Sequence, residues 1–182
     1  MKNQRNHEQH PKQLYSLPDP YPTPRVTGKS PYYASILLED YAGISGELTA
    51  IHQYIYHYLT MEECHTKIAT LAHQIAIVEM HHLTLLGKII CLLGNYPVMH
   101  SNDHGFMRFW NADFVYYGDT VYDKLSANMK HEMDAIQNYR RHQHLIDDPF
   151  IQELLERIIL DEEHHFQLFK TCRDEFCATF PD

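Results

Sequence analysis

A pattern of carboxylates and histidines occurs twice in the chain, in the same order. Each copy has an isolated Glu on one segment and a Glu-x-x-His on the next, and the residues are Glu47, Glu79, His82, Glu132, Glu162 and His165. Residues three apart lie about 60° apart around a helix axis, so the Glu and His of each Glu-x-x-His point into the same space. Two isolated glutamates and two Glu-x-x-His motifs, on four helices, form a two-metal site inside a four-helix bundle.

The predicted site has six ligands, four carboxylates and two imidazoles, for two metal ions. Two of the glutamates can bridge the ions, so each ion receives one His nitrogen and shares carboxylate oxygens. Mixed nitrogen and oxygen ligation with open positions suits Fe or Mn, whereas structural Zn prefers a closed tetrahedral shell. The sequence therefore predicts two Fe or two Mn ions per chain and does not choose between them.

A single Glu-x-x-His on a helix is weak evidence for a metal site. Two such motifs, each preceded by a matched isolated Glu, are much harder to explain by chance. Buried glutamates are also costly unless they are paired or bound to metal. The alternative is a bundle in which these polar side chains form a metal-free hydrogen-bond network.

The spacing of apolar residues predicts an all-α fold. Apolar side chains recur at three- and four-residue steps and predict four helices, over residues 34–61, 66–93, 120–145 and 149–174. Gly43 and Gly46 weaken the first of these helices locally. The chain has only seven glycines, and long stretches of its middle lack proline, which favours helix over an all-β fold.

Two segments are expected to be irregular. Residues 1–34 are polar and contain six prolines, so we expect an extended or disordered N-terminal arm before a bundle of residues 35–182. Residues 95–118 are long for a simple loop and contain an aromatic cluster. We expect this segment to be a long crossover between the second and third helices, held to the bundle by its aromatic side chains.

The surroundings of the two histidines predict a small difference between the metal positions. Asp161 lies four residues before His165, on the same helix face, and could accept the imidazole N–H. Val78 stands at the equivalent position before His82. We therefore expect a carboxylate partner for His165 and none of this kind for His82.

Four other aromatic side chains lie close to the motifs. Tyr54 and Tyr139 each follow an isolated Glu by seven residues, on the same face. Either phenol could hydrogen-bond a ligand carboxylate or lie in an electron-transfer path, and Tyr54 is the preferred catalytic candidate; core packing is the alternative. His81 and His164 point about 200° away from the neighbouring glutamates and are expected on the surface or in packing contacts.

Charge and cysteine usage limit the possible partners and location. The net charge is −9 and no block of Lys and Arg occurs, so nucleic acid and anionic membranes are not expected partners. The four cysteines form no Cys-x-x-Cys pair, which argues against a disulfide framework and favours a reducing cytoplasm. No signal peptide and no membrane-spanning segment are expected.

On these motifs the chain resembles the ferritin-like superfamily over residues of about 35–175, and within it the rubrerythrin and manganese-catalase branches. The resemblance implies that the six residues of the repeated pattern are the metal ligands. It also implies a role for Tyr54, which matches a tyrosine placed two turns after the first glutamate in ferritins and rubrerythrins. Rubrerythrins carry an added glutamate where Ala135 stands here, and usually a rubredoxin domain with two Cys-x-x-Cys pairs, which this chain lacks. Any electron donor would be another protein or a small reductant.

Three functions follow as hypotheses. The first is a redox enzyme that acts on hydrogen peroxide or dioxygen, as a rubrerythrin-like peroxidase or, with manganese, as a catalase. The second is a ferroxidase that handles and stores iron. The third is a structural, spore-associated protein stabilised by metal, a hypothesis that arises because similar small proteins of this superfamily occur in spore-forming bacteria. By analogy with ferritin-like bundles, we expect a homodimer.

Overall fold

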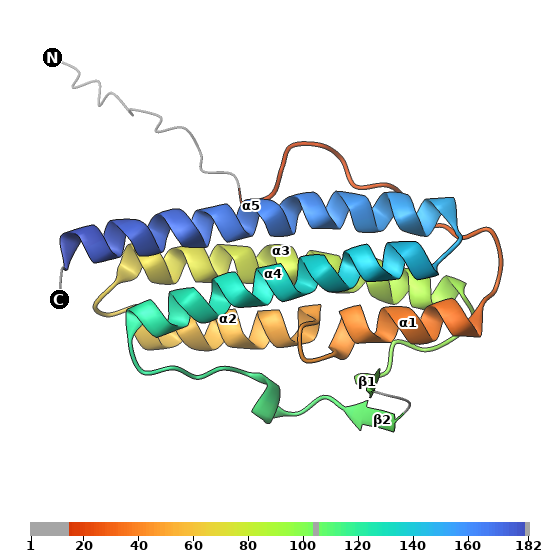
Figure 1. Cartoon of the computed structure of the whole chain (residues 1–182), viewed down its shortest axis with the longest axis horizontal. Helices are drawn as coiled ribbons and strands as arrows, with labels where there is room; N and C mark the ends of the chain where they lie inside the picture. The colour runs from red at the N-terminus through yellow and green to blue at the C-terminus, as the bar shows by residue number, and fades with distance from the viewer. Residues whose placement is uncertain (1–14, 104–105, 181–182) are drawn as a thin grey trace, which may run out of the picture.

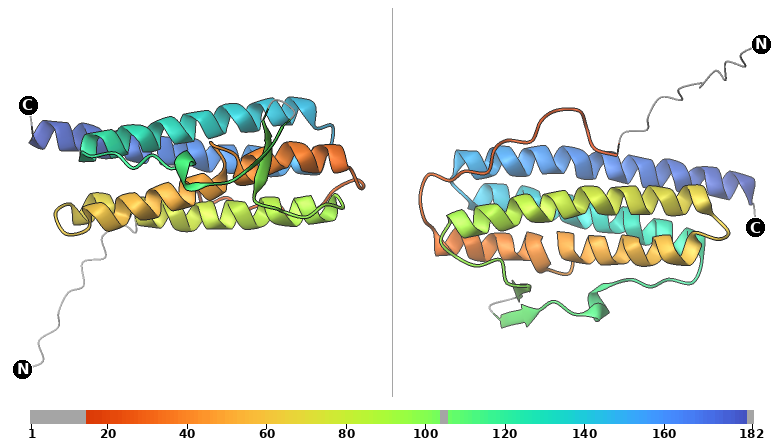
Figure 2. Two further views of the ribbon diagram at one scale, coloured as in Figure 1. Left: turned by 90° about the horizontal axis from the view of Figure 1, so that it is seen from below. Right: turned by 180° about the vertical axis from the view of Figure 1, so that it is seen from behind.

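The computed structural model describes residues 15–103 and 106–180, and it is a bundle of long helices (Figure 1). The helices are α1 (Pro31–Ala42), α2 (Glu47–Met61), α3 (Thr66–Leu92), α4 (Val121–Leu145) and α5 (Pro149–Thr179). Two further views show α3, α4 and α5 as three long rods, with α1 and α2 end to end in the fourth position (Figure 2). The predicted all-α four-helix bundle is confirmed, with one of its four positions divided between two helices.

The prediction of one continuous helix over residues 34–61 is wrong. α1 ends at Ala42, and α2 begins at Glu47. In the bend between them, a Cβ atom on Gly43 would lie 2.4 Å from the Glu39 carbonyl oxygen. A Cβ atom on Gly46 would lie 2.6 Å from the Asp40 carbonyl oxygen. The two glycines therefore allow a close backbone approach that breaks the helix, and Glu47 becomes the first residue of α2.

The other helix boundaries agree with the sequence to within about one residue, except that α5 continues to Thr179, beyond the predicted end at residue 174. Gly94, with a φ of 91°, follows the end of α3. Thr120 and Asp123 form a capping box at the start of α4. Asp148 caps α5 by accepting hydrogen bonds from two backbone N–H groups of its first turn, and Pro149 occupies the first helical position.

The segment that joins α3 to α4 contains a β-hairpin that the sequence did not predict. Strand β1 (His100–Asp103) pairs antiparallel with β2 (Phe106–Phe109), and a short 3-10 helix, η1 (Ala112–Phe114), follows. Phe114 is buried, and the Trp110 Nε1–H donates to Thr49 Oγ1 at 3.0 Å. The side chains of β2 are exposed. The aromatic residues near η1 therefore hold this segment to the bundle, and those of the hairpin do not.

Residues 15–30 form no helix or strand and run along the outside of the bundle (Figures 1 and 2). The backbone N–H and the hydroxyl of Thr27 both donate to Asp148. The Ser30 N–H donates to the Leu93 carbonyl at 3.1 Å. Because α1 begins at Pro31, the bundle includes the last residues of the predicted arm. The part of that prediction that concerns residues 1–14 lies outside the described residues.

Two apolar clusters form the core, one at each end of the bundle. One lies among α1, the second half of α3, α4 and the start of α5. The other lies among α2, the first half of α3, the start of α4 and the second half of α5. Along α3, Ile75 belongs to one cluster and Leu85 to the other. Glu79 and His82 lie between them in the sequence, so buried polar residues separate two water-excluding layers.

Among the described residues, α3 is the one helix that is long and apolar enough to cross a membrane. Its mean hydropathy reaches 1.6 over 18 residues, and half of that window is buried inside the protein. α3 packs against α1, α2 and α5, and Glu79 and His82 are fully buried on it. These contacts are those of a core helix, whose apolar faces meet other helices.

Candidate metal centre

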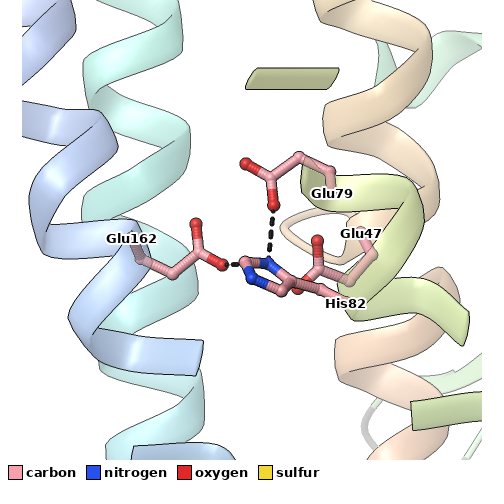
Figure 3. Close-up of side chains that lie close together, drawn as sticks. All are labelled: Glu47, Glu79, His82 and Glu162. Atoms are coloured by element: carbon pink, nitrogen blue, oxygen red, sulfur yellow. Dashed lines mark hydrogen bonds and ion pairs between the residues drawn. The ribbon is translucent and has the colours of Figure 1, made fainter. Parts of the chain in front are cut away.

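All six residues of the repeated pattern meet at one place in the core. They come from α2 (Glu47), α3 (Glu79 and His82), α4 (Glu132) and α5 (Glu162 and His165). Each is buried, and the most exposed of them, Glu47, has only 3% of its surface accessible. Figure 3 shows four of these side chains converging from three helices. The structure thus brings together every metal-site residue that the sequence predicted.

The six residues divide into two overlapping groups. One ligand atom from each of Glu47, Glu79, His82 and Glu162 lies within 4.8 Å of the others. The same holds for Glu79, Glu132, Glu162 and His165. Glu79 and Glu162 belong to both groups, so they are placed to bridge two ions. One ion position is then completed by Glu47 and His82 and the other by Glu132 and His165.

Both histidines turn the same ring nitrogen toward the centre. His82 Nδ1 lies 2.8 Å from Glu79 Oε2 and 3.0 Å from Glu162 Oε1. His165 Nδ1 lies 2.9 Å from Glu79 Oε1 and 3.5 Å from Glu162 Oε2. The Nε2 atom of each ring therefore faces outward. An imidazole bound to metal through Nδ1 carries its proton on Nε2, where it needs an acceptor.

The donor atoms of this cluster fit a pair of divalent cations. Within the described part of the chain, four of its atoms make no hydrogen bond of normal geometry, and these are Glu79 Oε1, Glu132 Oε2, Glu162 Oε1 and His165 Nδ1. Buried polar atoms without a well-aligned hydrogen bond are rare in folded proteins because each costs free energy. Two divalent cations would satisfy them and would balance the charge of four carboxylates.

Without cations, protons must neutralise part of the cluster. Burial, and then the carboxylates of Glu162 and Glu79, raise the pKa of both Glu47 and Glu132 well above the ordinary value. Burial alone would lower the pKa of His165, but its carboxylate neighbours raise it to about 10. Since metal ligands must be deprotonated, bound cations would displace these protons.

The two tyrosines contact the cluster in a reciprocal way. The Tyr54 hydroxyl, on α2, donates to Glu132 Oε1 of α4 at 2.6 Å. The Tyr139 hydroxyl, on α4, donates to Glu47 of α2. Both phenols are buried, and the Tyr54 ring packs edge-on against Phe169 with ring centroids 5.2 Å apart. Each tyrosine thus holds the glutamate of the facing helix.

The prediction that Asp161 serves His165 is wrong. Asp161 Oδ2 lies 3.2 Å from His82 Nε2, because its turn of α5 faces the outer edge of the His82 ring on α3. The outer nitrogen of His165 instead lies 2.8 Å from the backbone carbonyl oxygen of Tyr15. The surroundings of the two histidines do differ, but the carboxylate partner belongs to His82 and not, as expected, to His165.

Two residues beside the metal centre, Tyr21 and Arg157, were not predicted from the sequence. The Tyr21 hydroxyl donates to Asp161 and lies 3.1 Å from His82 Nε2. Arg157 Nη1 lies 2.8 Å from Asp161 Oδ1. Burial alone would raise the pKa of Asp161, but hydrogen bonds, first with His82 and then with Tyr21, the Leu17 N–H and Arg157, lower it to about 2. The spacing of Arg157 and Asp161, four residues apart on one helix, was a usable signal. Nothing in the proline-rich segment singled out Tyr21.

The first His of each His-His pair, His81 or His164, stays out of the cluster. His81 is exposed, and its ring meets that of Tyr21 edge-on with centroids 4.7 Å apart. His164 is half-buried. Neither belongs to the two groups of closely spaced ligand atoms.

Comparison with known proteins gives matches to two kinds of relative. The family model of manganese-containing catalases matches residues 17–104. The bacterioferritin of Brucella melitensis is 28% identical over 133 residues, which cover 70% of this chain and 76% of the relative. The bacterioferritin of Streptomyces coelicolor is 30% identical over 135 residues, which cover 72% of this chain and 75% of the relative.

Solved structures give the same two kinds of neighbour. The manganese catalase KatB from Anabaena superimposes with a TM-score of 0.80 at 25% identity, over 93% of this chain and 84% of that one. The Mycobacterium tuberculosis bacterioferritin has a TM-score of 0.68 at 24% identity, over 84% of this chain and 89% of that one. The chain belongs to the ferritin-like superfamily of di-metal carboxylate proteins. Within it, the chain is similar both to manganese catalases and to bacterioferritins.

Proposed function

We propose that this chain is a dinuclear metal redox protein that acts on hydrogen peroxide or dioxygen with two Fe or two Mn ions. The observation that carries the proposal is the buried cluster in which two groups of four ligand residues share Glu79 and Glu162. The match to the manganese-catalase family model favours peroxide as substrate. Dismutation of peroxide needs no external reductant, whereas a peroxidase would need an electron donor from outside the chain.

Glu79 and Glu162 would bridge the ions, and each ion would take one further Glu and one His. When bound, such a metal pair would supply redox electrons and positive charge at this site. The protein excludes water from the site, because apolar clusters lie on both sides of it. It also contributes fixed geometry, because the phenols of Tyr54 and Tyr139 hold Glu132 and Glu47 in place.

The test begins with the purified protein loaded anaerobically with Mn²⁺ or with Fe²⁺. Metal per chain is counted by mass spectrometry, and the loaded forms are then given hydrogen peroxide. We expect about two ions per chain, as for a di-metal carboxylate bundle, and evolution of O2 from peroxide by the Mn form. Peroxide loss that requires an added reductant would indicate the peroxidase alternative. Loaded protein that neither consumes peroxide nor oxidises Fe²⁺ would contradict the proposal.

Iron oxidation and storage is the second candidate, because curated relatives of this chain are bacterioferritins. It requires rapid oxidation of Fe²⁺ by O2 and assembly of many subunits into a closed shell. Light scattering distinguishes such a shell from the homodimer that we propose.

The exposed apolar side chains of Phe106, Met107 and Phe109 in the hairpin offer a surface on which two subunits could pair. The relatives named above give no support to a spore-associated structural role.

Tyr54 is part of the proposed catalytic machinery, and Tyr139 provides a matched control. If each phenol only positions its glutamate, Y54F and Y139F should slow peroxide turnover equally, because both variants lose one hydroxyl donor to a carboxylate. A role for Tyr54 in electron transfer predicts a larger loss in Y54F, about 10-fold or more, with metal content unchanged. Turnover by Y54F equal to that of the unmodified protein would remove Tyr54 from the mechanism.

A further inference from the structure

The outer nitrogens of the two central histidines face the same segment of chain. Residues 15–21 precede α1 and lie across α5 at the level of the cluster. His165 Nε2 lies 2.8 Å from the carbonyl oxygen of Tyr15, and His82 Nε2 lies 3.1 Å from the hydroxyl of Tyr21. Both histidines are fully buried. An irregular segment thus contacts both rings on the side away from the ions.

Contacts with α5 fix this segment in place. Arg157, only 5% exposed, donates from Nε to the Asp19 carbonyl at 2.9 Å and from Nη2 to the Leu17 carbonyl at 2.8 Å. Its guanidinium carbon lies 4.2 Å from the centroid of the Tyr21 ring. The Leu17 N–H in turn donates to Asp161 Oδ1 at 2.8 Å. A buried charge pair, Arg157 and Asp161, therefore anchors both the backbone and the tyrosine of the segment.

The two histidines meet chemically different acceptors there. His82 Nε2 faces a carboxylate, Asp161, at 3.2 Å, and the Tyr21 hydroxyl bonds to the same carboxylate. His165 Nε2 faces a neutral backbone carbonyl. An N–H that donates to a carboxylate makes a charge-assisted hydrogen bond, roughly twice as strong as a neutral one. It leaves more electron density on the opposite nitrogen, which becomes the better metal ligand.

We propose that residues 15–21 form the outer wall of the metal centre and make its two metal positions unequal. Asp161 and Tyr21 are positioning residues that make the position of Glu47 and His82 the tighter one. The position of Glu132 and His165 is the weaker one, because its imidazole has only the Tyr15 carbonyl as acceptor. This inference rests on the metal binding in the proposed function, but not on which reaction the metals perform.

The experiment is an anaerobic titration of the full-length, metal-free protein with Mn²⁺, in which free Mn²⁺ is measured by electron paramagnetic resonance. We expect two classes of site. D161N should weaken the tighter class by about 10- to 100-fold and leave the other class unchanged. Y21F should weaken the same class by a smaller factor, because it removes a hydroxyl and keeps the carboxylate. Circular dichroism melts of each variant show whether the bundle is intact, and Y21F is the conservative test if D161N is destabilised.

Two matched controls use the same substitutions away from the cluster. D174N changes an exposed aspartate on α5 whose partners are Lys170 and Arg173. Y33F removes a hydroxyl that accepts a hydrogen bond from the Asp147 N–H, far from the two histidines. Neither control should change either class of site by more than about twofold, since each lies outside the contacts of the metal ligands.

Variants in which one metal position is already impaired identify the position that D161N affects. E132Q impairs the weaker position and leaves Glu47 and His82 intact, so D161N should still lower affinity in that background. E47Q impairs the tighter position, so D161N should then have no effect on the class that remains. Equal weakening of both classes by D161N, or of neither, would overturn the proposal. Unmodified protein that binds two Mn²⁺ ions but does not act on peroxide or Fe²⁺ would remove the proposed function and leave this inference standing.

Discussion

Replacement of Glu162 by Gln should lower bound metal from about two ions per chain to fewer than about one, because this carboxylate belongs to both ion positions and metal ligation requires its charge. Gln has nearly the same volume, so the packing of α5 is preserved. Loss of the metal pair should reduce peroxide or Fe²⁺ turnover by about 100-fold or more, since several kcal/mol of charge stabilisation are removed. Mass spectrometry of bound metal and steady-state kinetics measure the two effects.

The next residue offers a matched control. Glu163 is exposed on the same helix, and E163Q removes only a surface pairing with Arg140 at 3.6 Å. Such pairs contribute little, so metal content and turnover should stay unchanged. E47Q should lose about one ion and not both, because Glu47 belongs to one group only. If E162Q still binds two ions and turns over normally, the shared-carboxylate arrangement is not the one that holds metal.

Removal of metal by a chelator should lower the midpoint of thermal unfolding by roughly 10 °C. Ligand bound at about 1,000 times its dissociation constant stabilises the folded state by about 4 kcal/mol. For a chain of this size, each kcal/mol shifts the midpoint by about 2–4 °C. In the metal-free core, protons held by Glu47, Glu132 and the two histidines must instead balance the charge of the cluster. Differential scanning calorimetry before and after chelation measures the shift.

E162Q supplies the control for this prediction as well, because a protein that binds no metal pair should not respond to the chelator. Adding Mn²⁺ back should restore the original midpoint and the turnover together. If chelation abolished folding altogether, the metals would have a structural role. If the chelator did not change the unfolding midpoint, the metals would have no role in stability. Loss of turnover without loss of fold is the result that the redox proposal requires.

The six metal-site residues could be predicted because helical geometry fixes where they point. A Glu and a His three residues apart share a face on any helix, and in a bundle the two helices with such pairs meet the two helices that carry an isolated Glu. Helical geometry predicts on which face each tyrosine lies, but it does not predict which carboxylate the tyrosine contacts. The spacing places Tyr54 on the inner face, but the structure was needed to show that its partner is Glu132 on another helix.

What the sequence missed depends on irregular backbone. The break between α1 and α2 arises from two close backbone approaches at Gly43 and Gly46, and helical periodicity continues across them. The β1–β2 hairpin is built from two four-residue strands, which are too short for an alternating pattern to stand out. Tyr21 reaches its partner across 140 residues of sequence. No local rule can predict such a contact.

The break before Glu47 also determines how the centre can change shape. Five of the six residues sit well inside their helices, where a shift of one side chain is opposed by hydrogen-bonded turns on both sides. Glu47 alone begins a helix, directly after Gly46, and no side chain caps the first turn there. We therefore expect any shift of a ligand during turnover to be largest at this carboxylate, where the Tyr139 hydroxyl of α4 is the contact that limits it. The short bend thus fixes the point at which α2 begins and, with it, the place of one metal ligand.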